Sequence, residues 1–180
     1  VGKSGYMTWE QIKEVETEEF ATIGHHSHSH GYLIDKDDNF FISDIEKANE
    51  IFLNNLGYIP NLFSHPFGEY SKFMRDYISE NFEFAFGQHS GVIDINKNKF
   101  ELPRFPINEK YGELKRFNSI INYFPLEYKK LLPEEKFLTK DTNPPKFKVK
   151  FFDEQKNLGN LNCYSNEANT WAKSITNFSG

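Results

Sequence analysis

A single stretch of this chain, residues 23–33, contains four of its six histidines. A neutral imidazole is the commonest protein ligand for zinc and related ions, because its ring nitrogen offers a lone pair near neutral pH. His26 and His30 are separated by three residues, and this spacing can bring both rings to one metal ion in a helical turn or in a tight loop after a strand. The stretch therefore predicts a metal site, and the fold must hold this loop in place.

Two other interpretations of the histidines stay open on composition alone. A cluster of His and Ser also occurs in solvated surface loops, and a His-rich tract can bind metal without a defined geometry. Residues 21–24 are typical of a short buried strand that leads directly into the histidines. Ligands at the end of a core strand are held rigidly, which favours an ordered site. For His25 and His28 we expect exposed side chains on the loop.

The order of residues in this stretch resembles the metal-binding motif of the polysaccharide deacetylases, the NodB-homology group or carbohydrate esterase family 4. In that motif, His-[Ser/Thr]-x-x-His supplies two of three metal ligands. The resemblance places these two ligands at His26 and His30, with Ser27 at the hydroxyl position. It implies a divalent metal, Zn²⁺ in the first place, with Co²⁺, Ni²⁺ or Mn²⁺ as alternatives.

A second motif follows in the order and at the spacing that the family has. The family sequence is Arg-x-Pro-[Phe/Tyr]-Gly; Ser64 stands in the place of the arginine. A similar loss is found in the branch that acts on poly-β-1,6-N-acetylglucosamine, so the resemblance is nearest to that branch. It implies that the main-chain N–H of Phe67 helps to hold the oxyanion. The residues implied to bind substrate are Pro66, Phe67, Gly68 and Tyr70.

Other parts of the family pattern are less complete. In residues 102–105, Arg104 resembles an arginine that supports the catalytic carboxylate, and a surface ion pair is an equal alternative. The late Leu-x-His motif, whose histidine is the general acid, has no match in residues 117–124. The early Thr-Phe-Asp-Asp motif provides the base and the third ligand, and nothing like it precedes Thr8. We therefore expect that motif to lie before Val1 in a longer protein.

Capping signals and apolar periodicity predict α/β units. Thr8 and Gln11 form a capping-box pattern, Ser43 is a candidate N-cap, and Gly57 is a stop signal. Helices are predicted at residues 9–18, 44–56, 71–81 and 112–122. Strands are predicted at residues 21–24, 61–64, 82–86, 102–105, 147–152 and 158–164, with a loop at 125–145. Strands alternating with helices are typical of a parallel sheet or barrel.

Together with the resemblance, this pattern predicts an α/β fold of two parts. Residues 1–124 would form a partial NodB-type distorted (β/α) barrel. Residues 125–180 would form a linker and the start of a β-rich C-terminal module.

The resemblance implies a hydrolase that removes N-acetyl groups from polysaccharide containing N-acetylglucosamine, in the periplasm, the cell envelope or outside the cell. Because the base and the third ligand are expected elsewhere, we expect this chain by itself to be inactive. One alternative is a non-catalytic carbohydrate-binding protein with a degenerate deacetylase barrel, whose aromatic side chains stack on sugar. Another is a metal-storage module that uses all four clustered histidines.

Composition argues against several other classes. The formal net charge is −5 and no basic patch stands out, which argues against a nucleic-acid partner. No apolar run approaches the length that spans a bilayer. Cys163 is the single cysteine, so an internal disulfide is excluded.

Overall fold

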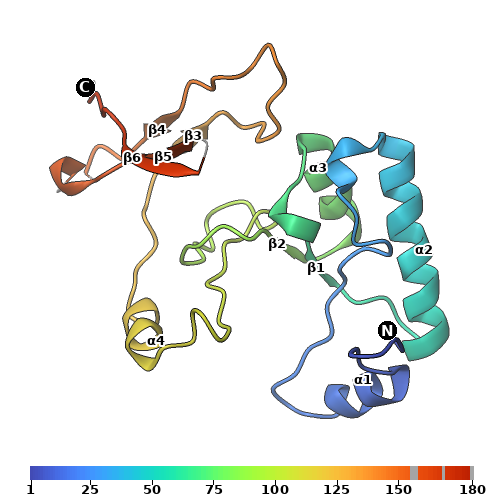
Figure 1. Ribbon diagram of the computed structural model, residues 1–180. Helices are drawn as coiled ribbons and strands as arrows, with labels where there is room; N and C mark the ends of the chain where they lie inside the picture. The colour runs from blue at the N-terminus through green and yellow to red at the C-terminus, as the bar shows by residue number, and fades with distance from the viewer. Residues whose placement is uncertain (155–157, 168, 179–180) are drawn as a thin grey trace.

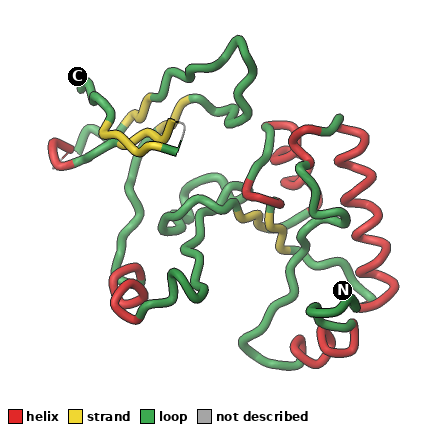
Figure 2. Tube along the Cα trace, viewed as in Figure 1, coloured by secondary structure: helices red, strands yellow, loops and turns green. Residues whose placement is uncertain are grey.

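The computed structural model describes residues 1–154, 158–167 and 169–178 (Figures 1 and 2). The helices are α1 (Trp9–Glu16), α2 (Asp38–Leu56), α3 (Lys72–Asn81) and α4 (Leu114–Ile120). The strands are β1 (Leu62–Ser64), β2 (Phe84–Phe86), β3 (Lys130–Leu132), β4 (Lys148–Lys150), β5 (Tyr164–Glu167) and β6 (Thr170–Lys173). Single 3₁₀ turns occupy Leu33–Asp35, Pro66–Gly68 and Leu158–Asn160.

The first helix begins as its capping pattern predicts. The Thr8 hydroxyl accepts the N–H of Gln11 at 3.2 Å, and the Gln11 side chain accepts the N–H of Thr8 at 2.8 Å. Two orphan donors are thereby satisfied at the start of α1. The helix ends at Glu16, slightly before the predicted end.

The longest helix, α2, begins earlier than predicted. Its N-cap is Asp37, whose carboxylate accepts the N–H of Phe40 at 2.9 Å, and Ser43 lies inside the helix. The earlier start places Phe41 on the buried face, where it is 1% exposed. Gly57 ends the helix with φ +83°, as expected for a left-handed C-cap.

A parallel sheet joined by α3 forms the centre of the fold. In β1 and β2, Leu62 lies opposite Phe84, and α3 is the crossover between the two strands. His25 forms a single parallel bridge to β1, and Leu102 forms one to β2. The sheet is thus open, in the order His25, β1, β2, Leu102, and no barrel closes within the described residues.

Two of the segments that we predicted as strands of this sheet do not form strands, so these two predictions are wrong. Residues 21–24 contain no strand and are not buried throughout, since Thr22 and Gly24 are exposed. Residues 102–105 are reduced to the bridge at Leu102, because Pro103 has no N–H to continue the ladder.

The apolar core lies between the sheet and the helices α2 and α3 (Figure 1). Burying each of the larger side chains fully contributes about 1.5–3 kcal/mol. The members that are 0–1% exposed are Phe41, Ile45, Phe63, Ile78 and Ala85. This packing fixes β1, and β1 in turn fixes the segments on either side of it.

The second half of the described chain is arranged differently. β3 pairs antiparallel with β4, and β5 pairs antiparallel with β6. β3 lies inside residues 125–145, which were predicted as loop. Residues 158–164 were predicted as one strand, but they form a 3₁₀ turn followed by the first residue of β5. A division of the chain near residue 125 stays a prediction.

None of the helices within the described residues combines the length and the apolar character that a membrane crossing requires.

Candidate functional site

The candidate site lies where the parallel segments of the sheet end. The loops after His25, β1, β2 and Leu102 leave the sheet at the same edge, because these four segments are parallel. In open α/β sheets, ligands bind at the carboxyl ends of the strands. This topology brings both sequence motifs and Arg104 into one region.

His25 belongs to the core, and the prediction that it is exposed is wrong. Two backbone hydrogen bonds of 2.7 and 2.9 Å hold it against β1, and its side chain is 1% exposed. Its ring packs 5.1–5.3 Å from those of Phe52, Phe63 and Phe82. Consecutive side chains of an extended segment point to opposite faces, so His26 faces outward. His28 is exposed, as predicted.

The rings of His26 and His30 lie side by side at the sheet edge. Their centroids are 4.8 Å apart and the rings meet edge to face. The Nδ1 atom of His26 lies 2.6 Å from the carbonyl oxygen of Ser64. Since a carbonyl only accepts, Nδ1 carries the proton and donates it there. The lone pair of His26 is therefore on Nε2.

The loop between the two histidines has a strained but well-supported backbone. Ser27 and His30 adopt φ values of +63° and +52°, which cost of the order of 1–3 kcal/mol each for residues other than glycine. The Ser27 hydroxyl accepts the N–H of His30 at 3.2 Å. The hydroxyl position of the motif thus positions the second histidine.

Asp44 of α2 holds the same loop in place through hydrogen bonds to its backbone. Its carboxylate accepts the N–H of His28 at 2.9 Å and that of Ser29 at 3.2 Å, and the residue is 6% exposed. Charge-assisted bonds of this kind are about twice as strong as neutral ones. No prediction from the sequence assigned a role to Asp44, although it stands next to Ile45 on the apolar face of a helix. A charged residue in such a position indicates a specific polar partner.

The turn Pro66–Gly68 forms the wall beside His30. Phe67 has φ +58°, and its ring lies 4.9 Å from that of His30. The ring of Tyr32 stacks on Phe67 at 4.0 Å with an interplanar angle of 6°. Tyr32 is 53% exposed, so one face of this aromatic pair is open to solvent. No sequence motif indicated a role for Tyr32.

Gly68 allows the turn to approach the loop after β2. Its φ is +71°, and a Cβ added there would lie 2.5 Å from the backbone nitrogen of Gln88. No other residue type fits this position without a backbone shift. The glycine of the second motif is thus required by the close approach of two loops.

Arg104 reaches the site from the last segment of the sheet. Its Nη1 donates to the hydroxyl of Ser64 at 3.4 Å. The residue that replaces the family arginine therefore contacts the arginine of the later segment. A cavity of about 360 Å³ lies next to it, lined by Gln88, Arg104, Phe105, Pro106 and Ile107.

Electrostatics favour the neutral form of His26. Burial is the main cause that lowers its pKa, and the nearby His30 and Arg104 lower it further, while the hydrogen bond to Ser64 opposes them. A histidine must be neutral to bind a metal.

Two of the predicted substrate-binding residues are in the interior. Tyr70 is 8% exposed, its ring lies 4.5 Å from that of His65, and its hydroxyl donates to Glu101 at 3.2 Å. Burial, together with Glu101, raises its pKa. Pro66 is also buried. The predicted contact of Tyr70 with substrate stays a prediction, and Pro66 lies on the inner side of its turn.

His26 and His30 can supply two of the ligands of a metal site. The Nδ1 of His26 donates to the carbonyl of Ser64 and leaves Nε2 for a metal ion, the arrangement that metal-binding histidines usually have. Within the described residues, however, no three His, Cys, Asp or Glu side chains gather closely enough to hold a metal ion. The chemistry of the donors fits a zinc-type ion, and the number of ligands is incomplete.

One family of known proteins matches part of this chain. A family model described as polysaccharide deacetylase matches residues 1–82, slightly less than half of the chain. Both histidines and the Pro66–Gly68 turn lie within this match. No curated protein sequence matches the chain.

Solved structures share the fold at low sequence identity. The deacetylase PplD from Streptococcus pyogenes, in complex with acetate, has a TM-score of 0.60 and 14% identity, over 68% of this chain and 54% of its own. A protein from Bacillus anthracis described as a polysaccharide deacetylase has a TM-score of 0.59 and 17% identity, over 67% and 38%. BC0361, a polysaccharide deacetylase from Bacillus cereus, has a TM-score of 0.58 and 16% identity, over 67% and 38%. This chain thus spans about half or less of the length of these structures.

The predicted resemblance is confirmed at the level of the family match and of the fold. The chain has a mixed α/β structure of the kind found in polysaccharide deacetylases, and residues 1–82 carry the sequence pattern of such a domain.

Proposed function

We propose that this chain is part of a metal-dependent hydrolase that removes acetyl groups from N-acetylglucosamine units of a polysaccharide. The observation that carries the proposal is the pair His26 and His30 at the sheet edge, with the Nδ1 of His26 held by Ser64. The match to polysaccharide deacetylases supports the same reaction class. The glycan would be met outside the cytoplasm, in the periplasm, the envelope or the medium.

In this proposal, the imidazoles of His26 and His30 hold the metal, Zn²⁺ in the first place and Co²⁺, Ni²⁺ or Mn²⁺ as alternatives. When bound, the metal supplies Lewis-acid chemistry to the amide carbonyl and the attacking water. The third ligand and the base would come from the Thr-Phe-Asp-Asp motif, which the described residues do not contain.

The residues of this chain would bind and orient the substrate. The main-chain N–H of Phe67 is the candidate donor to the oxyanion, because its turn lies directly beside His30. Arg104 would keep a positive charge near Ser64 and support the base. The loss of the motif arginine at Ser64 favours poly-β-1,6-N-acetylglucosamine as the glycan.

The test is acetate release by a longer protein in which this chain is joined to a segment that carries the Asp-Asp motif. Turnover should require added metal and should be abolished by His30→Ala, while the exposed His28→Ala serves as the matched control. Comparing β-1,6- with β-1,4-linked oligosaccharide tests the glycan. Turnover that survives His30→Ala would contradict the proposed role.

A second candidate function is sugar binding without hydrolysis. The specific observation in its favour is the stacked pair of Tyr32 and Phe67, whose outer face is open beside the histidines. Flat aromatic faces of this kind bind the apolar face of a pyranose ring. Binding of oligosaccharide by the longer protein without acetate release would favour this function over deacetylation.

A further inference from the structure

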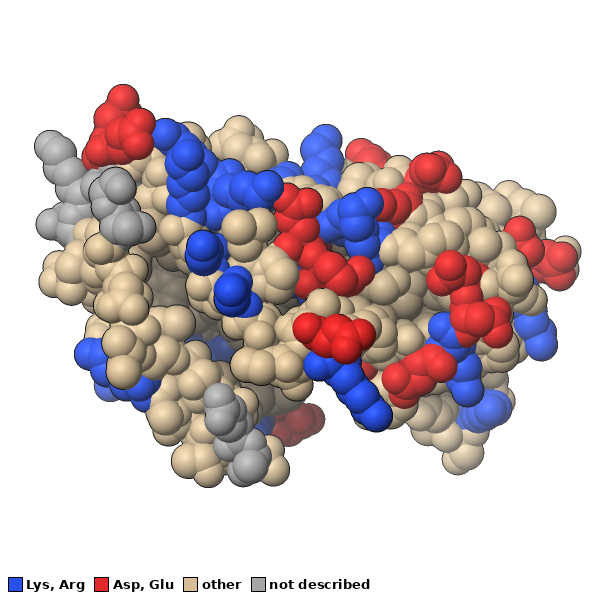
Figure 3. Space-filling model, turned by 90° about the horizontal axis from the view of Figure 1, so that it is seen from above, with Lys and Arg blue, Asp and Glu red and all other residues tan. Residues whose placement is uncertain are grey.

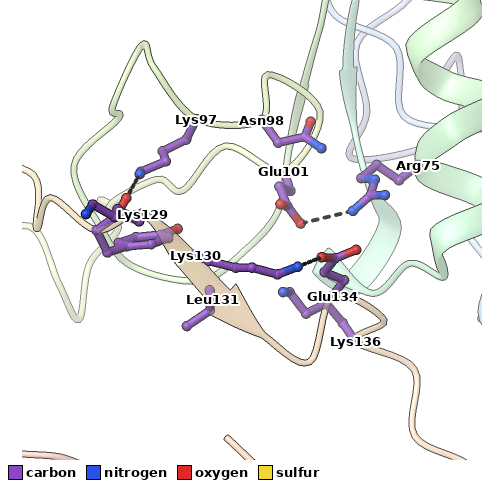
Figure 4. Close-up of a pocket in the computed structure, with 10 residues that line it drawn as sticks. Arg75, Lys97, Asn98, Glu101, Lys129, Lys130, Leu131, Glu134 and Lys136 are labelled. Atoms are coloured by element: carbon purple, nitrogen blue, oxygen red, sulfur yellow. Dashed lines mark hydrogen bonds and ion pairs between the residues drawn. The ribbon is translucent and has the colours of Figure 1, made fainter. Parts of the chain in front are cut away.

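A second cavity, of about 190 Å³, lies away from the histidines (Figure 4). Three parts of the chain form it: Arg75 of α3, residues 97–101, and residues 128–136, which include β3. None of the residues that line it belongs to the two deacetylase motifs.

The lining of this cavity is rich in cations, although the whole chain has a net charge of −5. The cationic side chains are Arg75, Lys97, Lys129, Lys130 and Lys136, and the carboxylates in the lining are Glu101 and Glu134. Five positive charges thus face two negative ones. In the space-filling view of Figure 3, several Lys and Arg side chains also gather on one side of the face shown.

Some of these charges are already paired. Lys130 lies 2.7 Å from Glu134, and Arg75 lies 3.8 Å from Glu101, as the dashed lines in Figure 4 show. Lys129 pairs at 3.0 Å with Asp153, which is not part of the lining. The two carboxylates of the lining are therefore engaged.

Lys97 and Lys136 have neutral partners in the described part of the chain. The ammonium of Lys97 donates to the carbonyl of Tyr128 and lies 3.9 Å from the centre of that ring. The ammonium of Lys136 donates to the carbonyl of Pro133 at 3.1 Å. Each ammonium has three N–H donors, so each keeps donors for another partner. Neither forms an ion pair with a carboxylate of the described residues.

The ordinary interpretation of such lysines is a solvated surface with water and salt as partners. Here, however, the cations come from three separate segments and surround one hollow, where an anion between them would reduce their mutual repulsion. A hollow of about 190 Å³ has room for one compact anionic group between these side chains.

We propose that this cavity binds a compact oxyanion, a phosphate or carboxylate group, through Lys97 and Lys136. The group is either a free anion or a substituent of an acidic glycan. The proposal does not depend on the deacetylase function, because it uses none of the residues of the histidine site.

Calorimetric titration of the whole chain with inorganic phosphate tests whether the cavity binds a free anion. The ionic strength is kept constant with chloride. Saturable binding is expected, and Lys97→Gln and Lys136→Gln should each weaken it by about tenfold. Lys47→Gln, on the exposed side of α2, is the matched control and should change nothing. Because Lys97 also contacts Tyr128, Lys136→Gln provides the decisive loss if Lys97→Gln fails to fold.

A gain of binding makes the test sharper. Glu134→Gln should tighten phosphate binding by several-fold, because it frees Lys130, whereas Glu50→Gln on the exposed side of α2 should not. Whether the cavity binds the anionic substituent of an acidic glycan is tested by comparing a glucuronate-containing oligosaccharide with a neutral chito-oligosaccharide. Binding of the acidic oligosaccharide alone, lost in Lys136→Gln, supports the cavity as a glycan-anion site. No saturable binding of either anion, or equal weakening by Lys47→Gln, overturns the proposal.

Discussion

The Nδ1 atom of His26 lies 2.6 Å from the carbonyl oxygen of Ser64, so the side chain of the first motif is fixed by the backbone beside the second. The two motifs are far apart in sequence, and the parallel pairing of His25 with β1 brings them together. This bond orients the ring of His26 toward His30 with Nε2 free of the proton. The metal chemistry proposed for the site depends on this arrangement.

For metal binding we expect weak affinity for Zn²⁺ in this chain alone, because two neutral ligands lack a charged third partner. His26→Ala and His30→Ala should each lower that affinity, on the order of tenfold or more. A competition titration with a zinc chelator measures the effect. His28→Ala is the control, and an equal loss in that variant would favour the metal-storage interpretation of the histidine cluster.

Replacing Asp44 by Asn should loosen the histidine loop. The buried carboxylate accepts two backbone N–H groups of that loop, and the amide would place a donor against one of them. We expect a loss of about 1–3 kcal/mol in the free energy of unfolding. Zinc affinity should also fall, by roughly tenfold, because Asp44 holds the loop that carries His30.

The control for Asp44→Asn is Glu50→Gln, which removes one negative charge from an exposed position of the same helix. Urea denaturation and zinc titration of both variants separate the effect of the loop from that of net charge. If Asp44→Asn kept full stability and zinc affinity, Asp44 would have no part in positioning the loop.

A pair of glycine substitutions tests the approach of the two loops. Gly68 and Gly57 have similar φ values of +71° and +83°, but only Gly68 has a backbone atom within 2.5 Å of an added Cβ. Gly57→Ala should cost about 1 kcal/mol for its backbone conformation alone. Gly68→Ala must also displace Gln88, so its loss of stability should be clearly larger. Equal losses in thermal denaturation would show that the turn can relax without cost.

Local sequence signals predicted much of the secondary structure of the first 86 residues. The capping box of Thr8 and the stop at Gly57 depend on neighbouring residues, and both are confirmed. The predicted start of α2 was wrong because Asp37 and Ser43 are both residue types that commonly cap helices. The burial of Phe41 decides between them. Tertiary packing, which the sequence does not display, makes that choice.

The environment of the histidines was less predictable. Whether His25 or His26 faces the core depends on the register of one bridge to Phe63, which is a long-range pairing. Asp44 contacts the loop from another element, so no local pattern connects them. β3 was missed for the same reason, since its partner β4 lies beyond a proline-containing loop.

Tyr32→Ala tests the aromatic pair as a sugar platform. Tyr32 stacks on Phe67 with its other face open, so its loss should weaken oligosaccharide binding by about three- to tenfold, the range of 0.5–1.5 kcal/mol for aromatic contacts. Calorimetry with a chito-oligosaccharide measures this. Tyr58→Ala, a partly exposed tyrosine just after α2, is the control, and identical affinities of the two variants would exclude the platform.

Buried neutral histidines should make the chain sensitive to acid. Burial lowers the pKa of His65 to about 4, while the unfolded state keeps the ordinary value near 6.5. As the pH falls below about 6.5, the unfolded state therefore binds the proton first, and the free energy of unfolding decreases until about pH 4. The expected slope for this residue is up to about 1.4 kcal/mol per pH unit. Burial also lowers the pKa of His25 to about 4, so His25 makes the dependence of stability on pH steeper in the same range.

The variant His65→Phe isolates this contribution. It removes the titrating ring, so the dependence of stability on pH between about 6.5 and 4 should become shallower by about one proton, whatever its effect on absolute stability. Phe82→Leu, a core substitution without a titrating group, should lower stability and leave the slope unchanged. Urea denaturation across this pH range, with a chelator present, measures both variants. An unchanged slope in His65→Phe would mean that His65 takes up its proton in the folded protein as readily as in the unfolded chain.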